Sequence, residues 1–330
     1  MTRPVSRRAF LKAGLGAACA AAAAPAVCAA GPAPRDGHLA TLIDVSRCIG
    51  CGACVEACRE SNAEKFPDPR KPFPRMYPSR VKVSDWSDRQ EVDDRLTPYN
   101  WLYIQHAEVT VEGETREITL PRRCMHCVNP PCVKLCPWGA ARQYANGISR
   151  IDMDMCLGGS KCQAVCPWDI PQRQTGDGLY LDLLPGFAGN GIMNKCDRCY
   201  DRVARGKTPA CIEACPEDVQ TIGPRKEILE KARILAGEMN GYLYGEKENG
   251  GTNTIYVSPV PFEQLGRAVD TGPGRPHFDP VEDTMADANR LGTAMLIAPL
   301  AGVAAAAGKA FLAVRRRSSD PRRETRSDKE

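Results

Sequence analysis

The stretch Cys124-Met125-His126-Cys127-Val128-Asn129-Pro130-Pro131-Cys132, continued by Val133-Lys134-Leu135-Cys136-Pro137, decides how this chain folds. It sets three cysteines close together and a fourth directly before a proline. Three further blocks of similar spacing lie at residues 48–58, 156–167 and 196–216. Together the four blocks hold fifteen of the seventeen cysteines: Cys48, Cys51, Cys54, Cys58, Cys124, Cys127, Cys132, Cys136, Cys156, Cys162, Cys166, Cys196, Cys199, Cys211 and Cys215.

This spacing of thiols is typical of iron–sulfur sites. In the bacterial ferredoxin run, three close cysteines wrap one cluster, and the fourth reaches across to a neighbouring cluster. Four blocks therefore predict four clusters, close enough for electrons to pass from one to the next. The pattern indicates a protein that carries electrons rather than one that performs a reaction of its own.

Two other uses of cysteine fit the spacing less well. A disulfide scaffold in an exported protein also contains many cysteines, but Cys-x2-Cys pairs repeated beside Cys-Pro suit ligation around a compact cluster. Zinc sites take four ligands as two pairs, whereas this chain offers triplets and a distal single cysteine. A zinc-stabilised structural protein with no redox role stays as the rival from a different class, and it predicts a colourless sample.

The composition favours a loop-rich fold. Of 330 residues, 43% are hydrophobic and only 6% aromatic, while glycine and proline contribute 29 and 27. Metal–thiolate bonds would supply part of the folding free energy, as they do at structural metal sites. The net charge of +4 is too small to indicate nucleic-acid binding. We predict an α+β fold that contains two bacterial-ferredoxin-like modules, a hairpin insertion and one C-terminal transmembrane helix.

Residues 1–30 predict an export signal. Ser6-Arg7-Arg8-Ala9-Phe10-Leu11-Lys12 is a twin-arginine motif, and an alanine-rich apolar run follows it. Cys19 and Cys28 lie inside this removable segment, so we do not expect them to bind metal. Export of the folded protein suits the chemistry, because thiols that already hold clusters are protected from oxidation on the way out.

The C-terminal part predicts a linker, one membrane span and a short tail. Residues 271–290 form the linker, and residues 291–314 form the span, which as a helix covers about 36 Å. A buried, Ala/Gly-rich helix of a soluble domain is the alternative. Arginines crowd the tail, residues 315–330, and mark the cytoplasmic end of the span. The cysteine domain is therefore predicted to lie at the periplasmic face of the membrane.

All four cysteine blocks fall in one predicted domain, residues 31–270, with an insertion at 59–123. The second half of the insertion alternates apolar and polar residues on either side of Gly113 and predicts a β-hairpin. We expect a short strand at 147–152, an amphipathic helix at 224–240 and another strand at 254–257.

Three segments of the chain resemble a known family. Residues 124–132, 195–202 and 209–216 are similar to motifs of the four-cluster iron–sulfur subunits of the dimethyl-sulfoxide-reductase and formate-dehydrogenase type. The export signal, the C-terminal span and residues 242–252 resemble, more narrowly, the ferredoxin-like subunit of hydrogenase-2-type nickel–iron hydrogenases. That resemblance implies an electron relay between a periplasmic catalytic subunit and an integral membrane, quinone-reactive subunit.

The resemblance also implies which cysteines share a cluster. Blocks one and four would form one ferredoxin unit, and blocks two and three would form the other. The implied sets are Cys48, Cys51 and Cys54 with Cys215; Cys196, Cys199 and Cys211 with Cys58; Cys124, Cys127 and Cys132 with Cys166; and Cys156 and Cys162 with Cys136.

The last set is one cysteine short, because block three has Gly159 where a further cysteine is needed. Three thiolates suit a [3Fe–4S] cluster, which lacks the iron that a fourth thiolate would hold. The alternative is a [4Fe–4S] cluster that takes water or a nearby oxygen, such as that of Ser160, on that iron. We expect three [4Fe–4S] clusters and one [3Fe–4S] cluster.

Several other residues lie beside the predicted ligands. Five cations could favour the reduced clusters or be ordinary solvated charges: Arg47, Arg123, Lys134, Lys161 and Lys195. His126 is expected to pack or to form a hydrogen bond, because its neighbours already complete a cysteine triplet. Trp138 and Trp168, which both follow Cys-Pro, are expected to pack against clusters.

Nothing in the sequence indicates a substrate site. It contains no nucleophile elbow, no Gly-rich nucleotide loop and no helical His-Glu-x-x-His. We therefore predict a non-catalytic, membrane-anchored electron-transfer subunit that needs partners at both ends. Within the same class, a subunit of a formate dehydrogenase or of a sulfur-compound or nitrogen-oxide reductase is the alternative to a hydrogenase subunit.

Overall fold

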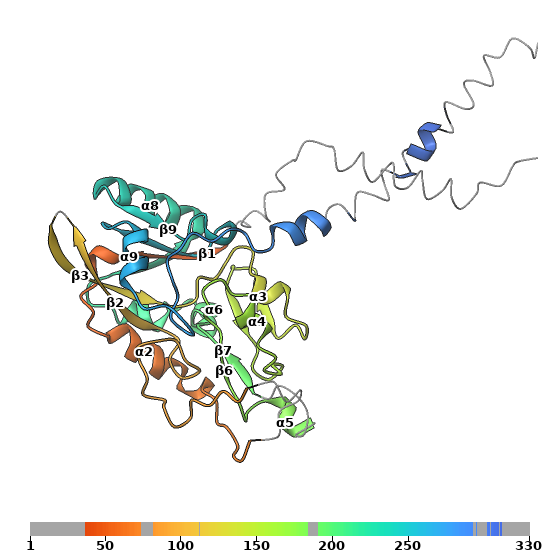
Figure 1. Ribbon diagram of the computed structural model, residues 1–330, viewed down its shortest axis with the longest axis horizontal. Coiled ribbons are helices and arrows are strands. Elements are labelled where there is room, and N and C mark those ends of the chain that lie inside the picture. The colour runs from red at the N-terminus through yellow and green to blue at the C-terminus, as the bar shows by residue number, and fades with distance from the viewer. Residues whose placement is uncertain are drawn as a thin grey trace, which may run out of the picture. The chain divides into compact units, whose positions relative to one another are not determined.

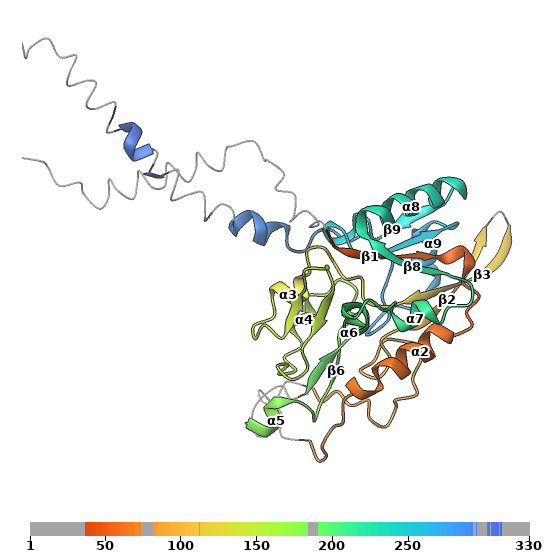
Figure 2. The ribbon, with the colours of Figure 1, turned by 180° about the vertical axis from the view of Figure 1, so that it is seen from behind.

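The computed structural model describes residues 37–73, 82–111, 113–183 and 191–292, with a few more positions between 295 and 311. Gly31–Met285 is one compact unit and contains all four cysteine blocks (Figures 1 and 2). The predicted export signal, the tail and most of the predicted membrane span lie outside the described residues. Among the residues that are described, no helix has both the length and the apolar character needed to cross a membrane.

A four-stranded sheet forms one side of the compact unit. Its order is β8 (Gln220–Pro224), β1 (Leu39–Asp44), β10 (Thr254–Ser258) and β9 (Tyr242–Tyr244). β1 runs parallel to β10 and antiparallel to β8, and β9 runs antiparallel to β10. The helix α8 (Arg225–Glu238) lies along this sheet (Figure 1). The predictions of a helix at 224–240 and a strand at 254–257 are confirmed.

An amphipathic pattern holds α8 in place. Its residues Ile228 and Ala232 are 1% and 0% exposed, and they pack against Leu42 and Ile255 of the sheet. The spacing of four residues puts both helix positions on the same face. Pro224, which precedes the first turn, has no N–H that the helix would leave unpaired.

The predicted hairpin is also confirmed, and its strands are longer than expected. β2 (Tyr103–Val111) pairs antiparallel with β3 (Glu114–Arg122) along their whole length. Two smaller hairpins follow in the chain: β4 (Ala141–Gln143) with β5 (Ser149–Ile151), and β6 (Gln172–Gln174) with β7 (Ile192–Asn194). The strand expected at 147–152 corresponds to β5.

Short helices follow the cysteine loops. They are α2 (Ala53–Asn62), α3 (Pro131–Lys134), α4 (Lys161–Ala164), α6 (Tyr200–Ala204) and α7 (Ala210–Glu213). α2 packs on α7, and α3 packs on α4. The remaining elements are α5 (Leu179–Leu183), α9 (Phe262–Ala268) and the 3-10 turns η1 (Val45–Arg47), η2 (Ala63–Lys65) and η3 (Glu248–Gly250). Helices of blocks one and four are thus neighbours, as are those of blocks two and three.

Part of the predicted linker is packed on the compact unit. Phe278 is 1% exposed and contacts the rings of Tyr244, Tyr256 and Phe262. The guanidinium of buried Arg122 lies 3.6 Å from the centre of the Phe278 ring. Its Nη2 donates hydrogen bonds to the carbonyls of residues 276 and 277. The described chain therefore stays in contact with the core well past residue 270.

We predict that Phe278→Ala lowers stability by about 3–5 kcal/mol, because it leaves a cavity among aromatic rings. The melting temperature of the anaerobic protein should fall by about 6–20 °C. Ile234→Ala is the matched control, since that side chain is 56% exposed on α8 and should change the melting temperature by about 2 °C or less. Equal effects of the two substitutions would mean that Phe278 is not part of the core.

Candidate metal centres

The fold brings the fifteen cysteines of the four blocks into four groups. The first group is Cys48, Cys51, Cys54 and Cys215; the second is Cys58, Cys196, Cys199 and Cys211; the third is Cys124, Cys127, Cys132 and Cys166; the fourth is Cys136, Cys156 and Cys162. Each group takes a member from a distant block. The groups coincide with the ligand sets that the resemblance implies.

The first and third groups each line a cavity. One small cavity lies against the four thiols of the first group, and another lies against the four thiols of the third. Apolar side chains make up most of both linings, and Trp168 is one of those around the third group. Its indole donates a hydrogen bond to the hydroxyl of Tyr244 at 2.8 Å. Polar side chains also take part: Glu217 and Gln220 around the first group, and His126, Ser149 and Lys195 around the third. Within the described ranges, no three or more His, Cys, Asp or Glu side chains converge closely enough to hold one metal ion.

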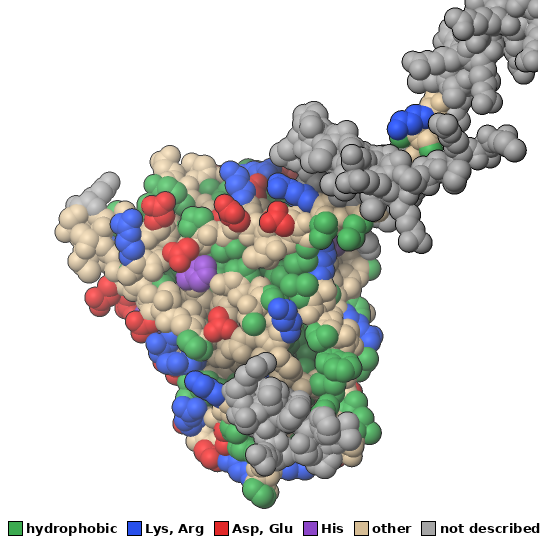
Figure 3. All heavy atoms as spheres, turned by 45° about the vertical axis from the view of Figure 1, so that its right-hand side comes forward, with side chains coloured by type: hydrophobic (Ala, Val, Ile, Leu, Met, Phe, Trp, Pro, Cys, Tyr) green, Lys and Arg blue, Asp and Glu red, His purple; other side chains and the backbone are tan. Residues whose placement is uncertain are grey.

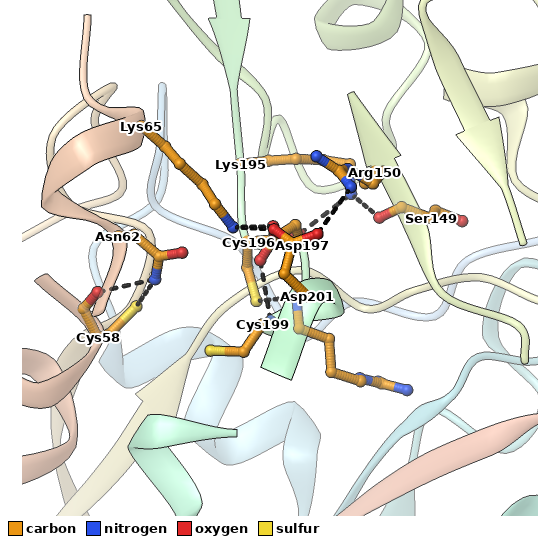
Figure 4. Close-up of polar contacts among 11 residues, drawn as sticks. Cys58, Asn62, Lys65, Ser149, Arg150, Lys195, Cys196, Asp197, Cys199 and Asp201 are labelled. Carbon is orange, nitrogen blue, oxygen red and sulfur yellow. Dashed lines mark hydrogen bonds and ion pairs between the residues drawn. The ribbon is translucent and has the colours of Figure 1, made fainter. Parts of the chain in front are cut away.

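The second group is the most deeply enclosed. Burial raises the pKa of Cys58, and so do the thiolates of its neighbours Cys211, Cys196 and Cys199. Figure 4 shows Cys58, on α2, facing Cys196 and Cys199 from the fourth block. Asn62 donates a hydrogen bond to the Cys58 carbonyl at 2.8 Å and lies 3.7 Å from its sulfur.

The fourth group has three cysteines and an open position. Gly159 lies in the loop between Cys156 and Cys162, and a Cβ atom added to it would meet nothing within 4 Å. The Ser160 hydroxyl lies 3.4 Å from the Gly158 carbonyl oxygen, to which it donates. A side chain at position 159 therefore has room in this loop.

Several apolar side chains are exposed beside the fourth group. Leu135, Trp138 and Met155 are 40%, 60% and 40% exposed. Figure 3 turns the side of α3 and α4 forward and shows hydrophobic side chains among charged ones on that face. The expectation that Trp138 packs against a cluster is wrong. The Trp138 side chain is mostly exposed to solvent, whereas Trp168 is 1% exposed and belongs to the hydrophobic core.

A backbone feature repeats in all four cysteine loops. The second residue after the first cysteine of each block has a positive φ: Gly50 (70°), His126 (46°), Gly158 (63°) and Arg198 (54°). This turn directs backbone N–H groups to sulfur, as at His126 to Cys124 (3.4 Å) and Arg198 to Cys196 (3.3 Å). A left-handed residue other than glycine costs about 1–2 kcal/mol. In the sequence, the repeat can be found only by aligning the four blocks on their first cysteine, because the residue type at this position varies.

His126 is confirmed as a packed, hydrogen-bonded residue. It is 1% exposed, and its Nδ1 accepts a hydrogen bond from the Ser149 amide at 3.2 Å. Burial holds its pKa well below the ordinary value, and nearby cations add to this effect. The imidazole is therefore neutral, and it lines the cavity of the third group.

The electrostatics of the groups fit a cationic metal cluster. Burial raises the pKa of Cys54 to about 12, and nearby thiolates, Cys211 foremost, add to the effect. Burial also raises the pKa of Cys132 and of Cys196 to about 11. Metal ligation needs deprotonated thiols, and thiolates crowded away from water are unfavourable without a compensating positive charge. Iron bound to them would supply that charge.

The four groups form a row. Three electrostatic contacts between thiolates join neighbouring groups: Cys54 with Cys211, Cys196 with Cys124, and Cys132 with Cys162. The row therefore runs from the first group to the fourth in order. Cys51 is exposed at one end and Cys136 is half-buried at the other, while most of the thiols between them are buried. Such an arrangement can take up an electron at one surface and deliver it at another.

Comparisons with known proteins agree with this geometry. Two models of a 4Fe–4S dicluster domain match the chain, at residues 47–140 and 115–225. A protein of Nitratidesulfovibrio vulgaris is 30% identical over 278 residues, which cover 81% of this chain and 68% of that protein. The hydrogenase-2 operon protein HybA of Escherichia coli O157:H7 is 29% identical over 299 residues, covering 79% and 83% of the two chains.

A third relative comes from another type of enzyme complex. The iron–sulfur subunit of the nitrate-inducible formate dehydrogenase of Escherichia coli K12 is 33% identical over 227 residues. The aligned part covers 67% of this chain and 68% of that subunit. The chain thus belongs to the family of iron–sulfur subunits built from 4Fe–4S dicluster domains.

Proposed function

We propose that this chain relays electrons between a periplasmic catalytic subunit, that of a nickel–iron hydrogenase, and a quinone-linked integral membrane subunit. The row of four cysteine groups from Cys51 to Cys136 is the observation that carries this proposal. Electron transfer is the whole of its chemistry, since the catalytic step belongs to the partner. The chain itself is not an enzyme in this account.

The residues of each group have a defined task. The thiolates of the four groups bind the clusters, which when bound supply one-electron exchange. The burial of most of these thiols excludes water from the row. Backbone amides such as that of Arg198 donate to the ligand sulfur and hold it in place. The protein therefore sets the position and the surroundings of each site, and it moves no proton in doing so.

The cluster types follow from the number of thiols. The first three groups have four cysteines each and would hold [4Fe–4S] clusters. The fourth has three, and we assign it a [3Fe–4S] cluster because the open position at Gly159 offers no ligand atom. A [4Fe–4S] cluster with water or the Ser160 oxygen on one iron is the alternative.

The hydrogenase assignment is supported by the extent of similarity. The match to HybA covers 83% of that protein, whereas the match to the formate dehydrogenase subunit covers 68%. The second of these relatives has the higher identity, 33% against 29%, so the formate dehydrogenase assignment is the second candidate. A sulfur-compound or nitrogen-oxide reductase complex is a third. The iron–sulfur relatives argue against the zinc-stabilised structural protein.

We place the compact unit at the periplasmic side of the membrane. The twin-arginine motif in residues 1–30 supports export, and the apolar run at 291–314 supports a single-pass anchor. The arginines of residues 315–330 then lie in the cytoplasm. The anchor would hold the compact unit at the membrane. The membrane subunit there would receive or supply the electrons.

The companion chains test the partner assignment. We predict that the complex leaves membranes only with detergent and that its largest companion subunit contains nickel and iron. Mass spectrometry of the companion and metal analysis of the complex are the measurements. A molybdopterin-containing companion would replace the hydrogenase assignment by the formate dehydrogenase type, and isolation without detergent would contradict the anchor.

Replacement of one ligand tests the cysteine groups. We predict that Cys211→Ser lowers the iron content by up to about four atoms per chain, because the second group then lacks a thiolate. Cys19→Ser is the matched control and should leave the iron content unchanged, because Cys19 lies in the predicted export signal. Iron analysis of anaerobic samples measures both. An unchanged iron content and unchanged spectrum in Cys211→Ser would remove that residue from the ligands.

Substitution at position 159 tests the cluster type. We predict that Gly159→Cys converts the fourth site to a [4Fe–4S] cluster, since it adds a fourth thiol to the loop between Cys156 and Cys162 and the added side chain meets no other atom. The electron paramagnetic resonance signal of an oxidised [3Fe–4S] cluster should be present in the wild type and absent from the variant. Ser160→Ala is the control and should keep that signal. A wild-type sample without the signal would favour a [4Fe–4S] cluster with an oxygen ligand.

A further inference from the structure

Four cationic side chains are buried in the middle of the compact unit. Arg122, Arg123 and Arg198 are each 1% exposed, and Lys195 is 5% exposed. Ion pairs among the described residues include none of these four. A buried charge without an opposite charge is strongly unfavourable. The question is what balances them.

Two of the four have evident structural roles. Arg122 stacks on Phe278 and donates to backbone carbonyls. Arg198 donates to the carbonyls of Leu39 and Asn253 at 2.7 and 2.8 Å. Both side chains fasten segments that are far apart in the sequence. The other two cations make a different kind of contact, to sulfur.

Arg123 lies against the second group. Its Nη1 donates to the sulfur of Cys211 at 3.0 Å. Its Nε and Nη2 are buried and have no hydrogen-bond partner in the described part of the chain. A guanidinium keeps its proton throughout the ordinary pH range. The guanidinium is therefore a permanent positive charge with donors to spare beside this group.

Lys195 lies between the second and third groups. Its Nζ is 3.5 Å from the sulfur of Cys124, in the third group, and 3.1 Å from the carbonyl oxygen of Cys196, in the second. It also donates to the Ser149 carbonyl. Its charge therefore acts on two groups at once.

The surroundings of the second group remain positive after its carboxylate is counted. Asp197 is 6% exposed and lies beside this group. Lys65 pairs with it at 2.8 Å and with Asp201 at 3.0 Å (Figure 4). Lys65 therefore balances the charge of Asp197. The charge of Arg123 has no acidic partner among the described residues.

The other three of the five cations singled out in the sequence lie in a different environment. Arg47, Lys134 and Lys161 are exposed. Water screens an exposed charge, so its effect on a buried group is small. Of the five cations singled out in the sequence, Arg123 and Lys195 are the two that share the low-dielectric interior with the thiols.

We propose that Arg123 and Lys195 are fixed buried charges that make the second cluster, and through Lys195 also the third, easier to reduce. The inference rests on the proposed function. Reduction adds one electron, which arrives from the neighbouring cluster, and no bond forms or breaks. The added negative charge is attracted to a nearby cation most strongly where water is absent. The two inner sites, which solvent cannot stabilise, receive that stabilisation from these side chains.

Reduction potentials of the intact complex test the proposal. Arg123→Met and Lys195→Met remove the charges and keep most of the volume. In an anaerobic redox titration followed by electron paramagnetic resonance, the equilibrium constant for reduction should fall about tenfold, or about 59 mV. Arg123→Met should act mainly on one cluster, and Lys195→Met on two. Lys161→Met, an exposed cation beside Cys162, should change every constant by about twofold or less.

The outcomes separate this inference from the proposed function. A wild-type complex without four clusters would contradict the function itself. Four clusters in the wild type, with unshifted potentials in fully loaded Arg123→Met and Lys195→Met, would overturn only the present inference.

Failure of the neutral variants to bind iron is also informative. Arg123→Lys and Lys195→Arg keep the charge while changing the shape. Iron retained by these two variants but lost by the methionine variants would support a requirement for charge. Iron lost by all four would overturn the proposal, because shape would then be the requirement.

Discussion

Thiolates repel one another, and this chain gathers fifteen cysteines into four groups that are mostly out of reach of water. Burial and mutual repulsion raise the pKa of thiols such as Cys54 to about 12, so the groups are unfavourable as bare thiolates. Bound iron removes the repulsion by adding positive charge at the centre of each group. The surrounding fold is best understood as the scaffold that makes such groups possible.

The scaffold uses distant parts of the chain for each group. Cys58 of the first block completes the group formed by the fourth block, and Cys215 of the fourth block completes the group formed by the first. This exchange links the two blocks. The sheet and α8 close one side, and the segment around Phe278 closes the aromatic core. Because binding of metal and folding share these contacts, the row of sites and the fold stabilise each other.

Much of this could be predicted from sequence, because spacing is a local property. Cys-x2-Cys triplets indicate the metal sites, and alternation and helical periodicity indicate the hairpin and α8. Spacing does not say which distant cysteine completes a group, and the family resemblance was needed for that. The exposure of Trp138, the burial of Phe278 and the left-handed turn at His126 depend on tertiary contacts. The export signal and the membrane span remain predictions. Residues 1–30 and most of residues 291–314 lie outside the described residues, and no helix among those described is long and apolar enough to cross a membrane.

The burial of charges is likewise invisible in the sequence. Arg123 and Lys161 both stand next to a ligand, yet one is enclosed against Cys211 and the other faces water. The metal content of anaerobically purified protein tests the central claim most directly. About fifteen or sixteen iron atoms per chain, with a comparable amount of sulfide and a brown colour, are predicted for four clusters. A folded, colourless chain that holds zinc or no metal would contradict the account.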